Sequence, residues 1–139
     1  MNIATVKEIY SRNYGSETFY KRSYCNSLIY TEGIMDFQQT LNATWLVDNI
    51  IYHLPKIIET YKAVDDGFFV VKIKVKNDSS GYVEIYREGY VNGEYDEHIT
   101  VIKQKLPFID LPTAYEYKFY LILSQTEPII FTFLLTSEY

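Results

Sequence analysis

The sequence has few of the residues that build reactive or covalently cross-linked sites: one cysteine, two histidines and six glycines among 139 residues. Cys25 has no second cysteine for an internal disulfide, and we expect an unreactive thiol in a reducing cytoplasm. The glycines form no phosphate-cradling loop and no dinucleotide-binding fingerprint. His53 and His98 lie in no metal-binding spacing, and both are expected to be partly exposed. We therefore expect no cofactor, no metal ion and no enzymatic activity, because no nucleophile lies beside a base in a recognisable pattern.

Long apolar runs and a basic-then-apolar leader are also missing. The sequence predicts a soluble cytoplasmic protein with no membrane contact. The balance of 13 Lys and Arg against 18 Asp and Glu gives a net charge of −5. Because general affinity for nucleic acid comes from cations that meet phosphates, this balance argues against nucleic-acid binding by the whole surface.

Aromatic residues, in contrast, are abundant: they make up 17% of the chain, with 15 Tyr, 8 Phe and 1 Trp. Tyrosine joins a large apolar ring to a hydroxyl, so it suits half-buried strands and protein interfaces. No repeat, low-complexity tract or linker divides the sequence. Residues 1–139 are therefore predicted to form a single domain.

The first half of the chain has several segments with helical spacing. Ile3–Tyr10 is predicted to be a short helix, and Asn13–Tyr30 irregular structure or short strands. Thr31 can cap a second helix and Asn42 a third. Pro55 lies inside the third helix, where it removes one hydrogen bond and clashes with the preceding turn, so we expect a kink or a break near His53.

The second half alternates apolar and polar residues with the period of β-strands. The predicted strands are Phe68–Lys76, Tyr82–Val91, Ile99–Lys105, Tyr115–Leu123 and Ile129–Leu135. Asn92-Gly93 is the dipeptide typical of a type I′ hairpin turn. Helices followed by strands predict an α+β fold, with the N-terminal helices packed on one face of an antiparallel sheet of about five strands. We expect Trp45 in that helix–sheet contact.

The first candidate binding surface is an acidic, tyrosine-rich hairpin over Tyr82–Glu97. Its carboxylates, which Arg87 offsets to a net charge of −4, are Glu84, Glu88, Glu94, Asp96 and Glu97. Its phenols are Tyr82, Tyr86, Tyr90 and Tyr95. Carboxylates and phenols together suit an Arg- and Lys-rich groove on a partner protein. An ordinary solvated hairpin is the alternative interpretation.

The second candidate surface is a file of lysines in the first predicted strand. Lys72, Lys74 and Lys76 share one face, with a spacing of ~6.6 to 7 Å that fits a phosphate backbone. The alternative is an edge strand that its lysines keep soluble. Single-stranded RNA or DNA is the ligand that such a strand with nearby aromatic rings favours.

Several short motifs, in order along the chain, are Gly15-Ser16-Glu17 with Tyr20, Tyr30-Thr31-Glu32-Gly33, Trp45-Leu46-Val47-Asp48, Asp110-Leu111-Pro112 and the closing Leu135-Thr136-Ser137-Glu138-Tyr139. With them the chain resembles an uncharacterised family of small proteins from bacteria, phages and mobile elements. Its members typically show Gly-Thr-Glu, Tyr-Thr-Asp-Gly, Trp-Leu-x-Asp and a terminal Pro-Ser-Glu-Tyr. Ser16, Glu32 and Thr136 depart from that pattern, and Asn92–Lys105 is longer than usual.

This resemblance implies a genomic context and no mechanism, because the family has no assigned activity. A small acidic cytoplasmic protein of that context is similar in kind to phage-encoded inhibitors of host defence, including anti-CRISPR proteins. The hypothesis is a non-enzymatic inhibitor that binds a CRISPR effector nuclease, or its guide-RNA-bound form, through the hairpin Tyr82–Glu97. The alternative is a mobile-element accessory protein that binds single-stranded nucleic acid through its lysines. The shared motifs are expected to hold the fold, with Trp45 buried.

Overall fold

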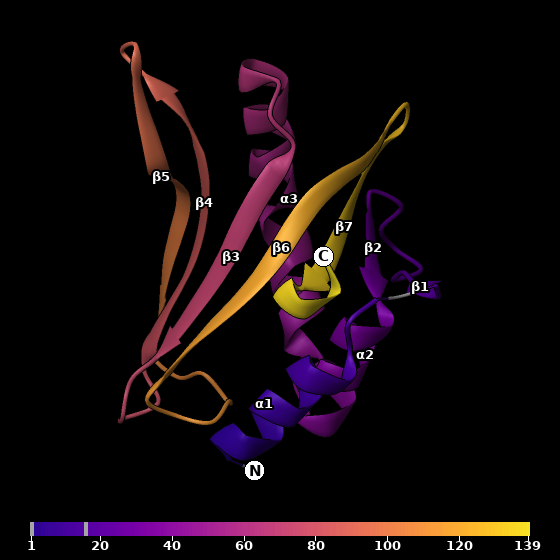
Figure 1. The fold of residues 1–139 in the computed structure, drawn as a ribbon, viewed down its shortest axis with the longest axis vertical. Helices are drawn as coiled ribbons and strands as arrows, with labels where there is room; N and C mark the ends of the chain where they lie inside the picture. The colour runs from indigo at the N-terminus through magenta and orange to yellow at the C-terminus, as the bar shows by residue number, and fades with distance from the viewer. Residues whose placement is uncertain (1, 16) are drawn as a thin grey trace.

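The fold combines helices with one mixed sheet, and the sequence prediction of an α+β class is confirmed. The computed structural model describes residues 2–15 and 17–139. The elements in those ranges are α1 (Ile3–Arg12), β1 (Phe19–Tyr20), β2 (Leu28–Thr31), α2 (Glu32–Thr40), α3 (Trp45–Val64), β3 (Phe68–Val75), β4 (Gly81–Val91), β5 (Glu94–Leu106), β6 (Tyr115–Thr126), β7 (Ile129–Leu135) and the 3₁₀ turn η1 (Thr136–Glu138). The strand order is β1-β2-β7-β6-β3-β4-β5 (Figure 1). Ser16, part of the first motif, lies outside the described residues.

The helix starts differ in how well the sequence predicts them. Thr31 caps α2 as expected, because its Oγ1 accepts a hydrogen bond from Ile34 N at 3.3 Å. The predicted Asn42 cap is wrong. Asn42 has φ 52° and turns the chain between α2 and α3, and α3 begins after Thr44 without a side-chain cap. A left-handed backbone suits an Asn in such a linker turn.

Helix α3 runs unbroken from Trp45 to Val64 through Pro55. Of the two predicted outcomes, a kink or a break near His53, the break is therefore wrong. Pro55 lies on the exposed side of the helix, where water can hydrogen-bond the carbonyl that a proline leaves unpaired. Packing of the opposite, buried side holds the helix together.

The hairpin prediction is confirmed. Asn92 and Gly93 have φ 53° and 82°, which is the pair of positive values that a type I′ turn requires. Strand β5 begins at Glu94, directly after this turn, and not at Ile99 as the alternation of the sequence predicts. The tight turn brings the residues on either side of it into register, so pairing starts before the apolar pattern does.

Within the described residues the sheet has seven strands and one parallel pair, whereas the sequence predicts about five antiparallel strands. The added strands are β1, with two residues, and β2, with four. The sequence predicts irregular structure or short strands over Asn13–Tyr30, and segments this short show no clear alternation that would locate each strand. The parallel pair is β2 with β7, and Leu28 lies opposite Phe131.

The hydrophobic core lies between the sheet and helices α2 and α3. Alternate residues of the central strand β3, Phe69, Val71 and Ile73, are fully buried on the helix side. Helix α3 lies behind the sheet in Figure 1, and the front face carries no long helix. Helix α1 lies at the lower end, against α2 and η1, so the three helices do not share one face of the sheet as predicted.

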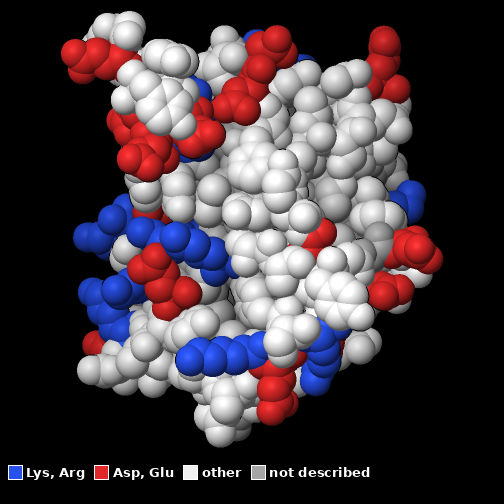
Figure 2. All heavy atoms as spheres, in the orientation of Figure 1, with Lys and Arg blue, Asp and Glu red and all other residues white. Residues whose placement is uncertain are grey.

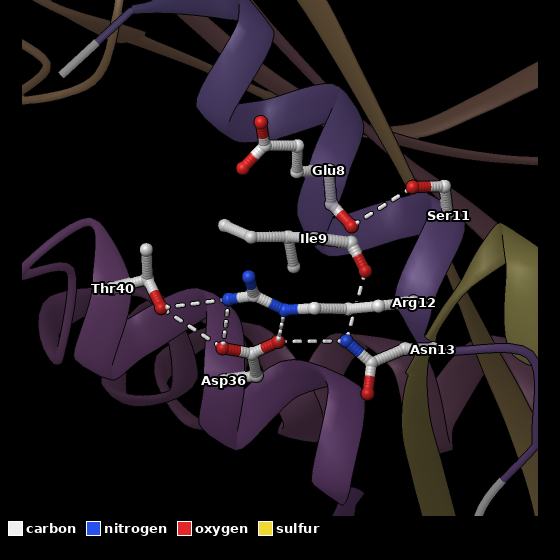
Figure 3. Close-up of polar contacts among 7 residues, drawn as sticks. All are labelled: Glu8, Ile9, Ser11, Arg12, Asn13, Asp36 and Thr40. Atoms are coloured by element: carbon white, nitrogen blue, oxygen red, sulfur yellow. Dashed lines mark hydrogen bonds and ion pairs between the residues drawn. The ribbon is translucent and has the colours of Figure 1, made fainter.

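A polar cluster fastens α1 to α2 (Figure 3). The Arg12 guanidinium donates two hydrogen bonds of 2.7 Å to the Asp36 carboxylate. Asn13 Nδ2 donates to Asp36 Oδ2 and to the Ile9 carbonyl, each at 2.8 Å, and so closes the end of α1. The hydrogen bonds from Arg12 hold the pKa of Asp36 below its usual value. We therefore assign this polar cluster a structural role, which is to hold α1 against α2.

Candidate functional site

The open front face of the sheet presents the side chains that alternate with the core residues. Cross-strand pairing sets its rows: Lys118 of β6, Lys72 of β3, Glu84 of β4 and Lys103 of β5 lie side by side. The next row toward the turn after β3 is Glu116, Lys74, Tyr82 and Lys105. The next row in the other direction is Tyr120, Val70, Tyr86 and Thr100.

The upper part of the β4–β5 hairpin extends beyond the rest of the sheet. Pairing between β3 and β4 ends at Val70 and Tyr86, so residues 87–99 form a ribbon of two strands only, named the hairpin tip here. Two register shifts, one on each side of Tyr86, accompany this departure. β-Bulges of that kind bend and twist a strand away from its sheet. Figure 1 shows the hairpin tip standing apart at the upper left.

The hairpin tip carries an exposed pair of tyrosines. Tyr90 is 73% and Tyr95 54% exposed, and their rings meet edge to face with centroids 5.5 Å apart. The Tyr95 hydroxyl donates a hydrogen bond of 2.5 Å to Glu88 Oε2. This bond raises the pKa of Tyr95 to about 12. The Tyr95 hydroxyl is therefore held in position, and both side chains are accessible to a partner.

The carboxylates of the hairpin tip are solvent-exposed as well. Glu88, Glu94, Asp96 and Glu97 all lie at its surface, and Arg87 is the one cation of residues 87–99. Figure 2 shows these acidic side chains as a red group at the upper left, separate from the blue group below it. The hairpin tip is thus a compact anionic patch with aromatic rings.

Glu84, predicted as part of the same binding surface, has a different environment. It is 4% exposed and accepts a hydrogen bond of 2.6 Å from Thr100 Oγ1. Its carboxylate also lies 2.9 Å from His98 Nε2 and 3.3 Å from Lys72 Nζ. Burial opposes ionisation, but the hydrogen bonds from Thr100, His98 and Lys72 outweigh it and lower the pKa of Glu84 to about 2. Glu84 is a buried anion with its own partners.

Two of the predicted tyrosines also belong to this inner cluster. The Tyr82 ring has Lys103 Nζ at 4.3 Å and Lys72 Nζ at 5.7 Å from its centroid, which is a double cation–π contact. Tyr86 stacks on His98 with centroids 3.8 Å apart. The predicted surface is therefore divided between the exposed hairpin tip and an inner cluster of Tyr82, Glu84 and Tyr86.

The structure also changes the interpretation of the second candidate surface, the lysines of β3. Strand β3 lies between β6 and β4, so the alternative interpretation as an edge strand is wrong. Lys72 is largely covered by its ion pair with Glu84, whereas Lys74, 4.0 Å from Glu116, and Lys76 are exposed. The sheet adds three lysines that the sequence interpretation missed: Lys103, Lys105 and Lys118. The alternation Lys103-Gln104-Lys105 was a signal for two of them.

Residues of the family motifs lie in structural contacts. Asp48 accepts hydrogen bonds from Arg22 Nε, at 3.3 Å, and from the Tyr24 hydroxyl. Trp45 is half-buried and packs against the core, with its indole N–H buried and without a hydrogen-bond partner among the described residues. The expectation that Trp45 packs at a helix–sheet contact agrees with this position, but its burial is partial.

The two histidines differ in their exposure. His53 is 8% exposed, and its Nε2 lies 2.8 Å from Gln104 Oε1 because α3 packs beneath β5. The prediction of a partly exposed His53 is therefore wrong, whereas the His98 side chain is 43% exposed, as predicted. Within residues 2–15 and 17–139, no three His, Cys, Asp or Glu side chains gather as a metal site would require. No helix in this part of the chain has the length and apolar character to cross a membrane.

Comparison with known proteins gives a family and no further relative. The model of a family of unknown function (DUF6876) matches residues 4–139. No curated protein and no solved structure matches the chain. The expected resemblance to an uncharacterised family is confirmed over almost the whole sequence.

Proposed function

The chain belongs to the DUF6876 family, and we propose that it is a non-enzymatic inhibitor of a host-defence protein that acts by binding. In this proposal the hairpin tip docks on an Arg- and Lys-rich surface of a CRISPR effector nuclease or its guide-RNA-bound form, in the bacterial cytoplasm. The role is that of an anti-CRISPR protein carried by a phage or mobile element.

One observation carries the proposal: the hairpin tip extends past the last β3 pairing and exposes Tyr90 and Tyr95 among carboxylates. A two-stranded ribbon is marginally stable on its own, and the hairpin tip adds little to the core. Tyr is enriched at protein interfaces, and carboxylates pair well with Arg. RNA-guided nucleases hold their nucleic acid in positively charged channels, which are surfaces of the complementary kind.

The charge of the chain limits how such an inhibitor would act. A domain of 139 residues has a diameter of about 37 Å, and duplex DNA of that length carries roughly 22 negative charges. The net charge of the chain is −5. Imitation of a whole DNA segment is therefore disfavoured, and the proposal is confined to a local contact of the hairpin tip.

The test is a binding and cleavage assay against a panel of purified CRISPR effectors, with and without guide RNA. The variant Glu94→Lys/Asp96→Lys/Glu97→Lys should lose both binding and inhibition. Its control is Glu8→Lys/Glu59→Lys/Glu127→Lys, which changes the net charge equally at exposed sites outside the hairpin tip. The control should inhibit normally.

Two results would contradict the proposal. The first is no binding and no inhibition across the panel. The second is equal loss in both charge-reversed variants, which would show that total charge and not the hairpin tip decides binding.

A further inference from the structure

We propose that the open face of the sheet is a second binding surface, which takes single-stranded nucleic acid. Its phosphates would lie along lysines of β3, β5 and β6, and its bases on the aromatic rings beside them. This surface is separate from the hairpin tip, and the inference does not depend on the proposed inhibition.

The lysines of this surface form two files with one flanking cation. The files are Lys72, Lys74 and Lys76 on β3 and its continuation, and Lys103 and Lys105 on β5; Lys118 of β6 lies beside Lys72. Alternate residues of one strand are ~7 Å apart. Strand β4 lies between the two files, so they are about 10 Å apart. Figure 2 shows the blue side chains gathered on this part of the face, below the acidic hairpin tip.

Most of these charges are available to a ligand. Glu84 is ionised but buried, and Lys72 compensates it at 3.3 Å. Glu116 is the other carboxylate in these rows, and it lies 4.0 Å from Lys74 in a contact where both side chains are about half exposed. The exposed lysines therefore outnumber the opposing charges, although the whole chain has a net charge of −5. A local excess of cations is what a phosphate backbone recognises.

Aromatic rings lie next to the lysines on the same face. Tyr120 follows Lys118 by two residues on β6, and its ring packs with Phe68 at 5.0 Å and with Tyr139 at 5.4 Å. Tyr139 is 76% exposed, so one side of this cluster is open. A base that stacks on such a ring gains about 1–3 kcal/mol, whatever its identity.

The combination favours a single strand over a duplex. An open sheet face meets only one backbone of a duplex, and paired bases cannot reach its aromatic rings. Unpaired bases can stack there while their phosphates follow the lysines. Tyr82 takes no part in stacking, because Lys72 and Lys103 lie over its ring.

The test is a fluorescence-anisotropy titration of the full chain with labelled oligo(dT), oligo(U) and a duplex, each about 15 nucleotides long. Single strands should bind more tightly than the duplex, and log K should fall with log salt with a slope of about −2 to −3.5. Lys103→Glu/Lys105→Glu should weaken binding by at least about tenfold at low salt. If circular dichroism shows that Lys103→Glu/Lys105→Glu does not fold, Lys103→Gln/Lys105→Gln is measured in its place.

Three comparisons make the result specific. Lys21→Glu/Lys62→Glu carries the same charge change at exposed sites off this face and should bind within about twofold of the wild type. Tyr139→Ala should lose about fivefold or more without a change of salt slope. The hairpin-tip variant Glu94→Lys/Asp96→Lys/Glu97→Lys should bind nucleic acid at least as well as the wild type, which separates this inference from the proposed function.

The inference is overturned if no oligonucleotide binds at low salt, or if the duplex binds as tightly as the single strands. It is equally overturned if Tyr139→Ala binds normally, since contact would then rest on charge alone. Equal weakening in both Lys→Glu variants would show attraction by net charge and no site on this face.

Discussion

Glu138 occupies the space that a side chain at position 33 would need. A Cβ on Gly33 would overlap with Glu138 Oε1, well inside contact distance. The carboxylate is held there by hydrogen bonds from Thr31 Oγ1 at 2.6 Å, Gly33 N at 3.1 Å and Leu135 N at 3.0 Å. The motif Tyr30-Thr31-Glu32-Gly33 and the closing motif of the sequence thus meet at the start of α2, where the Glu138 anion accepts the Gly33 N–H of the first helical turn.

Gly33→Ala should lower the free energy of unfolding by about 1–3 kcal/mol, because the added methyl group displaces the Glu138 carboxylate from its donors. Gly15→Ala is the control, since no atom of the described residues, its chain neighbours apart, lies within 4 Å of a Cβ at that position. Urea denaturation of Gly33→Ala, Glu138→Ala and the double variant measures the coupling. The double variant should lose much less free energy of unfolding than the sum of the two single losses. Additive losses would mean that the two residues do not act on each other.

Glu84 should make the stability of the protein depend on pH below neutrality. Its pKa is lowered from 4.5 to about 2 in the folded state, so the unfolded chain binds its proton first as the pH falls. The stabilisation is complete above pH 4.5 and is lost between that value and about 2, which amounts to about 3 kcal/mol.

Glu84→Gln tests this pH dependence directly. The variant should be less stable than the wild type at pH 7 and should approach it at acid pH, where the wild-type carboxyl is protonated. Chemical denaturation over a pH series measures the difference. A constant difference at every pH would show that the loss comes from packing and not from the charge of Glu84.

Trp45→Phe should change stability by less than about 1 kcal/mol. The phenyl ring retains much of the packing, and the substitution removes an indole N–H that is buried without a partner among the described residues. Trp45→Ala should be clearly worse, because it also removes the apolar contact with the core. Thermal denaturation of both variants distinguishes packing from hydrogen bonding, and a large loss for Trp45→Phe would show that the N–H has a partner after all.

Reversal of Glu94, Asp96 and Glu97 to Lys should leave the melting temperature within a few degrees of the wild type. These side chains are exposed and take part in no salt bridge in the described part of the chain, and exposed charges contribute little to stability. Differential scanning calorimetry measures the shift. Unfolding at a much lower temperature would mean that the hairpin tip supports the core, and loss of partner binding by this variant would then carry no information about the interface.

The sequence predicts best those elements whose pattern is local. Alternation over β3 and β4 and the Asn92-Gly93 turn led directly to the observed strands and hairpin. The sequence allows short strands within Asn13–Tyr30 but does not locate strand β2, because its place in the sheet depends on β7, a strand far away in the chain. Local pattern has no access to that pairing.

The candidate surfaces show the same division. The exposure of the hairpin-tip side chains is predictable from the sequence, because its polar composition is typical of a solvated hairpin. The burial of Glu84 does not, because it depends on Lys72, His98 and Thr100 from two neighbouring strands. Nor does the gathering of Lys103 and Lys118 around β3, since strand order decides which files of side chains become neighbours.

The parallel contact between β2 and β7 has a consequence for synthesis of the chain. The Thr31 hydroxyl donates a hydrogen bond to Glu138 at this junction, and the two residues are 107 positions apart in the chain. At roughly 5–20 residues per second, the ribosome finishes the last strand several seconds or more after the segment that must receive it. Strand β2 and the start of α2 therefore wait with open hydrogen-bonding edges until β7 emerges. Pairing over so long a separation is also slow to form, so closure of this junction is expected to be the last step of folding, and the one at which chaperones would act.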